Sequence, residues 1–394
     1  SGELGAGGNV NIKSGSTQDL ASDSGNSLIS SADAQGSSGS FSISSGTSGM
    51  SDSGIVSISS GNSRSGRAGN VLVGTGSSDT TVGADVLISA GESTAQRGIG
   101  GDVNVLAGIG EEGGDVMLHA GEGVKGNGGS LNILGGMSSG GVGTGGSVII
   151  LGGEGIDGAS VGGSVSIGGG SSTDSIGGSL LLSGGSSETA STGSISMRSS
   201  DASGSNAFSG DVKIATGDSL SGSAGNIGVI GGDSRDLSSS VLIQSGSSSL
   251  GKGGDIILNT GSGVTGGDVF LEGGMAQQGN GGAILMKSGS TDESLATSGR
   301  VNIKSANAIG TSGDMNVRSG NSELGMTGNV AIKSGDSKTE TAGKITLLAG
   351  TGTSTEGASV NLRAGHTTMQ GAQGGELSMS AGSGSVGGEV LIRS

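Results

Sequence analysis

The residues with the clearest chemical potential are aspartates at one position of a repeated motif. Asp85, Asp102 and Asp115 fall in three consecutive copies of the motif, and Asp255 and Asp268 fall in two. If consecutive copies stack about 4.8 Å apart, these carboxylates repel one another, and a bound Ca²⁺ would relieve the repulsion. The alternative interpretation is turn chemistry, in which the carboxylate accepts hydrogen bonds from nearby backbone N–H groups. The calcium-binding pattern Gly-Gly-x-Gly-x-Asp matches only once, at residues 152–157, and is not repeated along the chain, which favours turn chemistry, so we expect no cofactor, with calcium the one candidate ion.

Other residues that could do chemistry lack a suitable setting. The chain has no cysteine, and its two histidines, His119 and His366, are far apart in the sequence. The run from Gly246 to Lys252 resembles a phosphate-binding loop, but Gly253 stands where such a loop needs Ser or Thr. With 92 Gly in 394 residues, other glycine-rich nucleotide motifs are expected by chance about five times. We expect no enzymatic activity.

Charge and composition also exclude several partners. Eighteen Lys and Arg against 34 Asp and Glu give a net charge of −16, and only 1% of the residues are aromatic. Such a chain has neither the basic surface nor the stacking platforms that nucleic acids need. The longest run of large apolar residues, Val148 to Leu151, is far shorter than the roughly 20 residues of a membrane-spanning helix. We therefore expect neither nucleic-acid binding nor a membrane span.

The element that must position these residues is a short repeat. The pattern of Gly8-Asn9-Val10-Asn11-Ile12 recurs in 26 copies, with a period of about 15 residues. The first aliphatic position is Val, Ile, Leu, Met or Phe in 25 copies, and the second, two residues later, is Val, Ile, Leu or Met in all 26. Aliphatic residues at alternate positions predict a strand with one buried face. Most repeats have an odd length, and length changes in pairs preserve this alternation.

These features predict an all-β fold. We expect a single-chain parallel β-solenoid of about 26 coils, with one repeat of roughly 15 residues per coil. Two repeats per coil, giving about 13 coils, is the alternative. Residues 1–394 are expected to form one continuous array without evident caps, as part of a longer array or filament.

Two outward-facing sets of side chains predict an interaction surface. Large apolar residues occupy positions beside the aliphatic pair that should face solvent, and basic residues follow the motif in the last third of the chain. An isolated rod is not expected to expose so much apolar surface. Lateral packing between rods is preferred, and a basic ridge could pair with an acidic neighbour or an anionic polysaccharide. The residues are Leu72, Leu87, Leu106, Met117, Leu134, Ile149, Leu151, Lys287, Lys304, Arg318, Lys333 and Arg363.

The segment Ser164-Val165-Ser166-Ile167-Gly168 resembles the strand of the parallel β-rolls in bacterial surface adhesins. The chain is also similar to other Gly/Ser-rich repeat proteins of microbial and algal cell surfaces. The resemblance implies an extracellular or cell-surface protein. The absence of evident caps and the outward apolar side chains add the expectation of a structural protein whose partner is itself, assembled end to end and laterally into stiff filaments. The alternative is an adhesin shaft or surface-binding module for polysaccharide or, less favoured because Thr ladders are absent, for ice.

Overall fold

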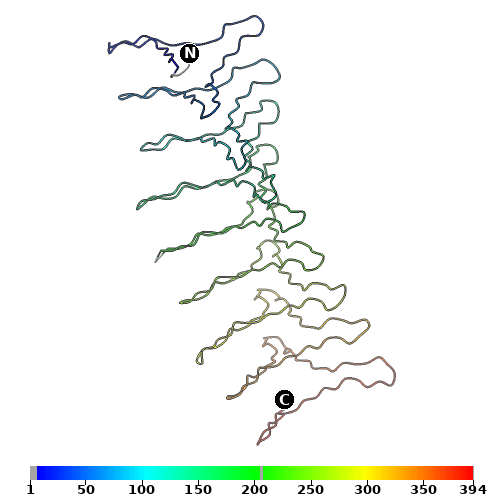
Figure 1. The fold of residues 1–394 in the computed structure, drawn as a ribbon. Helices are drawn as coiled ribbons and strands as arrows, with labels where there is room; N and C mark the ends of the chain where they lie inside the picture. The colour runs from blue at the N-terminus through cyan, green and yellow to red at the C-terminus, as the bar shows by residue number, and fades with distance from the viewer. Residues whose placement is uncertain (1–6, 205–206, 394) are drawn as a thin grey trace. The chain divides into compact units, whose positions relative to one another are not determined.

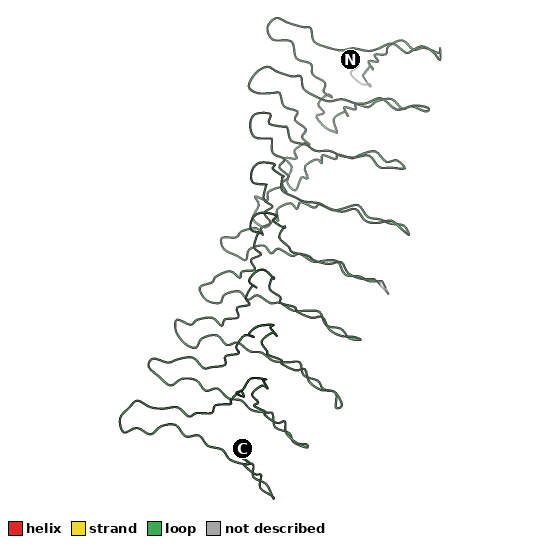
Figure 2. Ribbon diagram, turned by 180° about the vertical axis from the view of Figure 1, so that it is seen from behind, coloured by secondary structure: helices red, strands yellow, loops and turns green. Residues whose placement is uncertain are grey.

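The structure is a computed structural model that describes residues 7–204 and 207–393. The chain divides into two compact units, Ser1–Gly210 and Asp211–Ser394. Within each unit the backbone forms a succession of elongated loops, one after another along the chain (Figure 1). Figure 2 draws the described residues entirely as loops and turns, because they contain no α-helix and no β-strand.

The prediction of an all-β parallel solenoid is therefore wrong, whether with about 26 coils or with about 13. A solenoid needs backbone hydrogen bonds between segments of successive coils. The described residues make 21 backbone–backbone hydrogen bonds, and each closes a local loop or turn instead. Each repeat offers only two or three aliphatic side chains for burial, whereas fixing a glycine-rich backbone carries a large entropic cost.

The repeat consists of two parts with different behaviour. The first part is the aliphatic segment, which has eight residues. It begins two residues before the first aliphatic residue, at what we call the opening position. It ends five residues after the first aliphatic residue, at the closing position. Both end positions are glycine in most copies, as in Gly101–Gly108. The second part is a tip loop, which joins the closing position to the next opening position. The segment has constant length, so all variation in repeat length lies in the tip loops.

A backbone hydrogen bond closes many tip loops at their base. The N–H of the opening glycine donates to the carbonyl oxygen of the preceding closing glycine, as from Gly163 to Gly153 at 2.8 Å. Fourteen such bonds occur in the described residues, and every one joins glycines 6, 8 or 10 positions apart. The three repeats of even length would need a separation of seven, and none of them has this bond.

Loop closure fits the preference for odd repeat lengths, since the bond occurs in 14 of the 22 odd-length repeats and in none of the three even-length ones. Two added residues give one to each arm of the loop, so the donor and acceptor at the base still face each other. One added residue alters a single arm and turns the donor away. In the even-length repeat whose first aliphatic position is Ile227, the Ser239 hydroxyl instead donates to the carbonyl oxygen of Gly232 at 3.1 Å.

The length of the tip loop also selects the turn at its end. All seven 17-residue repeats place a hydrogen bond between residues three apart at the same register, such as Ser160 N–H to the carbonyl of Asp157 at 2.8 Å. Eight of the 15-residue repeats instead use a serine hydroxyl that accepts from the N–H three residues later, as Ser172 does from Ser175. Serine and threonine compete well for backbone donors in such turns.

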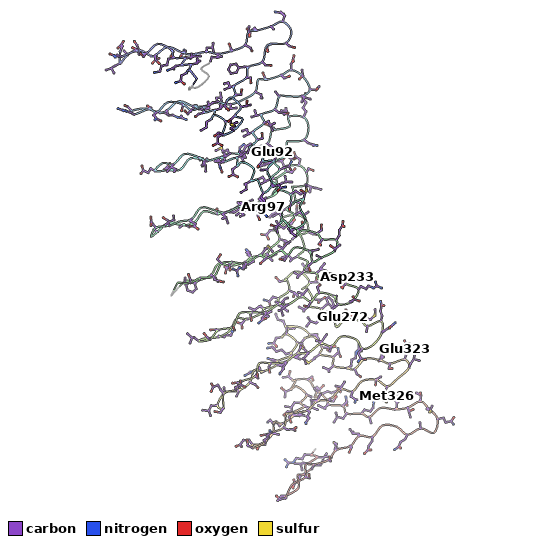
Figure 3. All side chains as sticks on the ribbon, in the orientation of Figure 1. Glu92, Arg97, Asp233, Glu272, Glu323 and Met326 are labelled. Atoms are coloured by element: carbon purple, nitrogen blue, oxygen red, sulfur yellow. The ribbon has the colours of Figure 1, made fainter. Side chains whose placement is uncertain are left out.

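No side chain among the described residues is buried, so this part of the chain has no hydrophobic core. Figure 3 shows side chains along both units standing clear of the backbone, including the tip-loop residues Glu92, Asp233 and Glu323. Folded proteins ordinarily enclose most of their Val, Ile and Leu. The local loops are thus formed without the burial that usually stabilises a fold.

Candidate interaction surface

The aliphatic segments are the most repetitive surface of the molecule. Along one of them the exposed fraction alternates: 49% at Val148, 75% at Ile149, 61% at Ile150 and 83% at Leu151. Alternate residues of an extended chain point to opposite sides. This segment therefore presents one side with its first and second aliphatic positions and an opposite, more open side.

The first aliphatic position has nearly the same surroundings throughout. From Phe41 to Val390, every side chain at this position is between 48% and 58% exposed. Val10, in the first copy, is 90% exposed. The environment of this side is thus set by the repeat itself, and about half of each side chain remains open to contact.

Sequence reasoning missed a third position that shapes the segment. The residue just before the closing position is Ser, Thr, Ala or Gly in all 26 copies, and this uniformity is the signal that could have found it. This small residue lies against the opening glycine on the other side of the loop base. For example, a Cβ added to Gly54 would be 3.5 Å from the Cβ of Ser45. Most of the least exposed residues of the described chain occupy this position, including Ala107, Gly152 and Ser288.

Glycine at this position makes the closest loop bases. A Cβ added to Gly152 would overlap the carbonyl oxygen of Gly163, and the same holds for four further glycines at the equivalent place: Gly135, Gly169, Gly184 and Gly273. In these five repeats the closing hydrogen bond is 2.8 Å, against 2.9–3.1 Å in the other nine. Only glycine allows the two backbones to approach this closely.

The aspartates proposed as calcium ligands are not gathered into a site. Asp85, Asp102, Asp115, Asp255 and Asp268 are all exposed. In the described residues no three Asp, Glu or His side chains are close enough to hold a metal ion. Asp255 instead pairs with Lys252, whose Nζ lies 2.7 Å from its carboxylate. Calcium binding stays a prediction from the sequence.

Turn chemistry does occur at an aspartate in a tip loop. The Ala21 N–H donates to the Asp19 carboxylate at 3.1 Å, and the Ser22 hydroxyl donates to it at 2.7 Å. These two hydrogen bonds, the backbone one first, lower the pKa of Asp19 below its ordinary value of 3.8. Both stabilise the charged form of the carboxyl group.

The residues predicted to form the interaction surface are exposed, and all except Ile149 and Leu151, which share segment 146–153, lie on separate segments. The apolar set, Leu72, Leu87, Leu106, Met117, Leu134, Ile149 and Leu151, is between 74% and 95% exposed. The basic set, Lys287, Lys304, Arg318, Lys333 and Arg363, is exposed as well. The Lys333 Nζ lies 3.2 Å from the carboxylate of Asp336, which is in the tip loop that follows its segment. Contact with another molecule stays a prediction for both sets.

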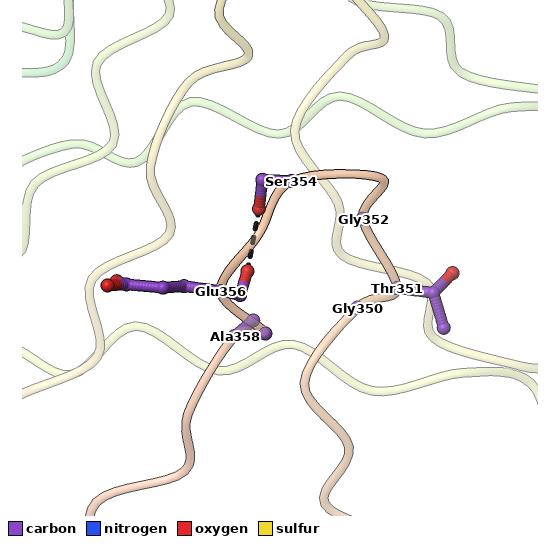
Figure 4. A pocket seen from close by; sticks show the side chains of 7 residues that line it. Gly350, Thr351, Gly352, Ser354, Glu356 and Ala358 are labelled. Carbon is purple, nitrogen blue, oxygen red and sulfur yellow. Dashed lines mark hydrogen bonds between the residues drawn. The ribbon is translucent and has the colours of Figure 1, made fainter.

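One hollow in the described residues lies inside a single tip loop. Gly350, Gly352 and Ala358 border it, and the Ser354 hydroxyl donates to the carbonyl oxygen of Glu356 at 2.6 Å (Figure 4). The side chains of Thr351 and Glu356 point away from the loop. The hollow therefore offers a ligand no converging polar groups.

Charge is divided sharply between the two parts of the repeat. The tip loops contain 23 acidic and 7 basic residues, which matches the whole net charge of −16. The aliphatic segments contain 10 acidic and 11 basic residues and are nearly neutral. Mutual repulsion thus acts mainly between tip loops, whereas segments can approach one another without a net electrostatic penalty.

The part of the chain that the structure describes holds no helix with the length and apolarity that a membrane span requires. Comparison of the chain with protein-family models, curated proteins and solved structures finds no match.

Proposed function

We propose that this chain is a structural protein of the extracellular space or cell surface that associates with further copies of itself through its aliphatic segments. The observation that carries the proposal is the series of half-exposed apolar side chains from Phe41 to Val390, repeated in one environment and without a core in the described residues. Repeated exposed apolar surface is typical of association sites. The extracellular setting rests on the resemblance of the repeat to Gly/Ser-rich repeat proteins of microbial and algal cell surfaces.

The distribution of charge supports the same function. The acidic tip loops keep the chain hydrated and project from the segments, while the segments are neutral and apolar. Covering the open half of one first-position valine would contribute about 1 kcal/mol, since full burial of such a side chain gives roughly 1.5–3 kcal/mol. A contact along several segments therefore accumulates enough free energy for association, whereas one segment does not.

Sedimentation velocity over a concentration series, followed by electron microscopy, tests the proposal. We expect species larger than one chain that increase with concentration and lengthen into filaments. Chains that stay monomeric up to high concentration would overturn it. Such monomers would then be assayed against polysaccharides and ice.

A matched pair of variants tests whether the segments carry the association. Val148→Ser, Val165→Ser and Val269→Ser together remove three half-exposed segment side chains, and we expect association about a hundredfold weaker, from about 1 kcal/mol each. The control makes the same change in tip loops, at the open Val142, Val161 and Val264. Equal weakening by both variants would count against a segment-specific contact.

A further inference from the structure

The backbone of each aliphatic segment is left without a partner. In the described residues, every backbone–backbone hydrogen bond joins a pair of loop-base glycines or two tip-loop residues. The described N–H and C=O groups between the opening and closing positions therefore have no backbone partner within the chain. An extended row of such groups is a template for pairing with another chain.

Most charged residues in the segments lie at two positions with opposite predominant signs; the exceptions are Lys213, Glu272, Arg300 and Lys344. Nine of the ten acidic residues precede the first aliphatic position: Asp85, Asp102, Asp115, Asp211, Asp255, Asp268, Asp314, Glu376 and Glu389. Eight of the eleven basic residues follow the second aliphatic position: Lys13, Arg198, Lys287, Lys304, Arg318, Lys333, Arg363 and Arg393. The two positions lie symmetrically about the middle residue of the aliphatic triplet, two residues to either side.

This symmetry distinguishes the two ways in which segments can pair. In an antiparallel pair centred on the middle residue, each acidic position faces a basic position, and the first aliphatic position faces the second. In a parallel, in-register pair, acidic residues face acidic residues and basic residues face basic ones. Opposite charges directly across a pair stabilise it, and like charges destabilise it.

We propose that the partner of the aliphatic segments is a second copy of this chain whose segments run antiparallel to those of the first. The proposal rests on the self-association proposed above and adds its orientation. Segment 313–320 is self-complementary, because Asp314 and Arg318 would meet the Arg318 and Asp314 of the second copy. Neither side chain forms an ion pair in the part of the chain that the structure describes.

Disulfide cross-linking measures the orientation directly, since the chain has no native cysteine. Met315→Cys and Val317→Cys occupy the two aliphatic positions of this segment. In an antiparallel pair these residues lie opposite each other, within the reach of a disulfide. We expect cross-linked dimers chiefly when the two variants are mixed and oxidised. Efficient cross-linking of Met315→Cys with itself would overturn the proposal in favour of parallel pairing.

Charge neutralisation provides a second test in intact chains. Asp314→Asn with Glu389→Gln removes the acidic partner in the two segments that carry opposite charges at both of these positions, and we expect association several-fold weaker in low salt. The exchange Asp314→Arg with Arg318→Asp preserves antiparallel complementarity, so we expect it to associate like the parent. Stronger association after neutralisation would show relief of like-charge contacts and would overturn the proposal.

These outcomes separate the orientation from the function it rests on. A parent chain that sediments as a monomer would remove both proposals. If the parent chain associates but the Met315→Cys variant forms disulfide dimers only with itself, the antiparallel arrangement is wrong and the structural role remains.

Discussion

Two adjacent glycines at one loop base should respond in opposite ways to the same substitution. A Cβ on Gly152 would overlap the carbonyl oxygen of Gly163, whereas a Cβ on Gly153 would meet nothing within 4 Å. Gly152→Ala must therefore push the two backbones apart and break the 2.8 Å bond from the Gly163 N–H to the Gly153 carbonyl. Gly153→Ala leaves the bond intact and reduces the freedom of the open chain, which favours the loop by about 0.4–1 kcal/mol.

The size of the effect follows from the hydrogen bond. A bond of this kind contributes about 0.5–1.5 kcal/mol net, which corresponds to protection of the Gly163 amide from solvent exchange by about 2- to 13-fold. Amide exchange followed by NMR measures this directly. We expect protection to be lost in Gly152→Ala and to be kept or increased in Gly153→Ala. Equal protection in the parent and in Gly152→Ala would refute the close-approach argument, and loss in both variants would show that glycine flexibility alone matters.

Three further predictions concern the tip loops. Arg97 has a φ of 61°, a left-handed conformation that favours glycine, so Arg97→Gly should stabilise its turn by about 1 kcal/mol, seen as slower exchange of the Gly98 amide, while Gln96→Gly should not. The Asp19 carboxyl should titrate by NMR below its ordinary pKa of 3.8. The stability that it contributes to the turn is present above pH 3.8 and is lost as the pH falls through the lowered pKa. Ser22→Ala removes one of the two hydrogen bonds and should bring the midpoint of the titration back toward the ordinary pKa. Inserting two residues into tip loop 154–162 should preserve protection of the Gly163 amide, whereas inserting one should abolish it.

The sequence alone reveals the period, the position of the aliphatic pair and the parity of the repeat lengths. These depend on residue type and spacing, which can be read directly from copies such as Val148 and Val165. From spacing alone, the parity indicates an extended strand continuing through the repeat. The structure attributes it to closure of a tip loop between Gly153 and Gly163, and both interpretations require changes in steps of two. Spacing by itself cannot distinguish them.

The candidate surface shows the same limit. The exposed middle residues, such as Leu72 and Ile149, are evident from their hydrophobic pattern, whereas the small residue before the closing position shows only as uniform small size, because small side chains carry no hydrophobic or charged signal. Its role depends on the approach of a second backbone, which exists only once the loop is closed.

What the sequence by itself determined is therefore the composition of each face: neutral aliphatic segments, acidic tip loops and glycines at fixed places. What only the tertiary structure decided is which groups find partners. Whether the N–H of an opening glycine bonds to a loop base or to a neighbouring segment depends on the free energy of long-range pairing. That free energy combines burial, chain entropy and charge over the whole chain, so it is not encoded at any single position. In the described part of this chain the local loop bases form and the aliphatic segments stay open.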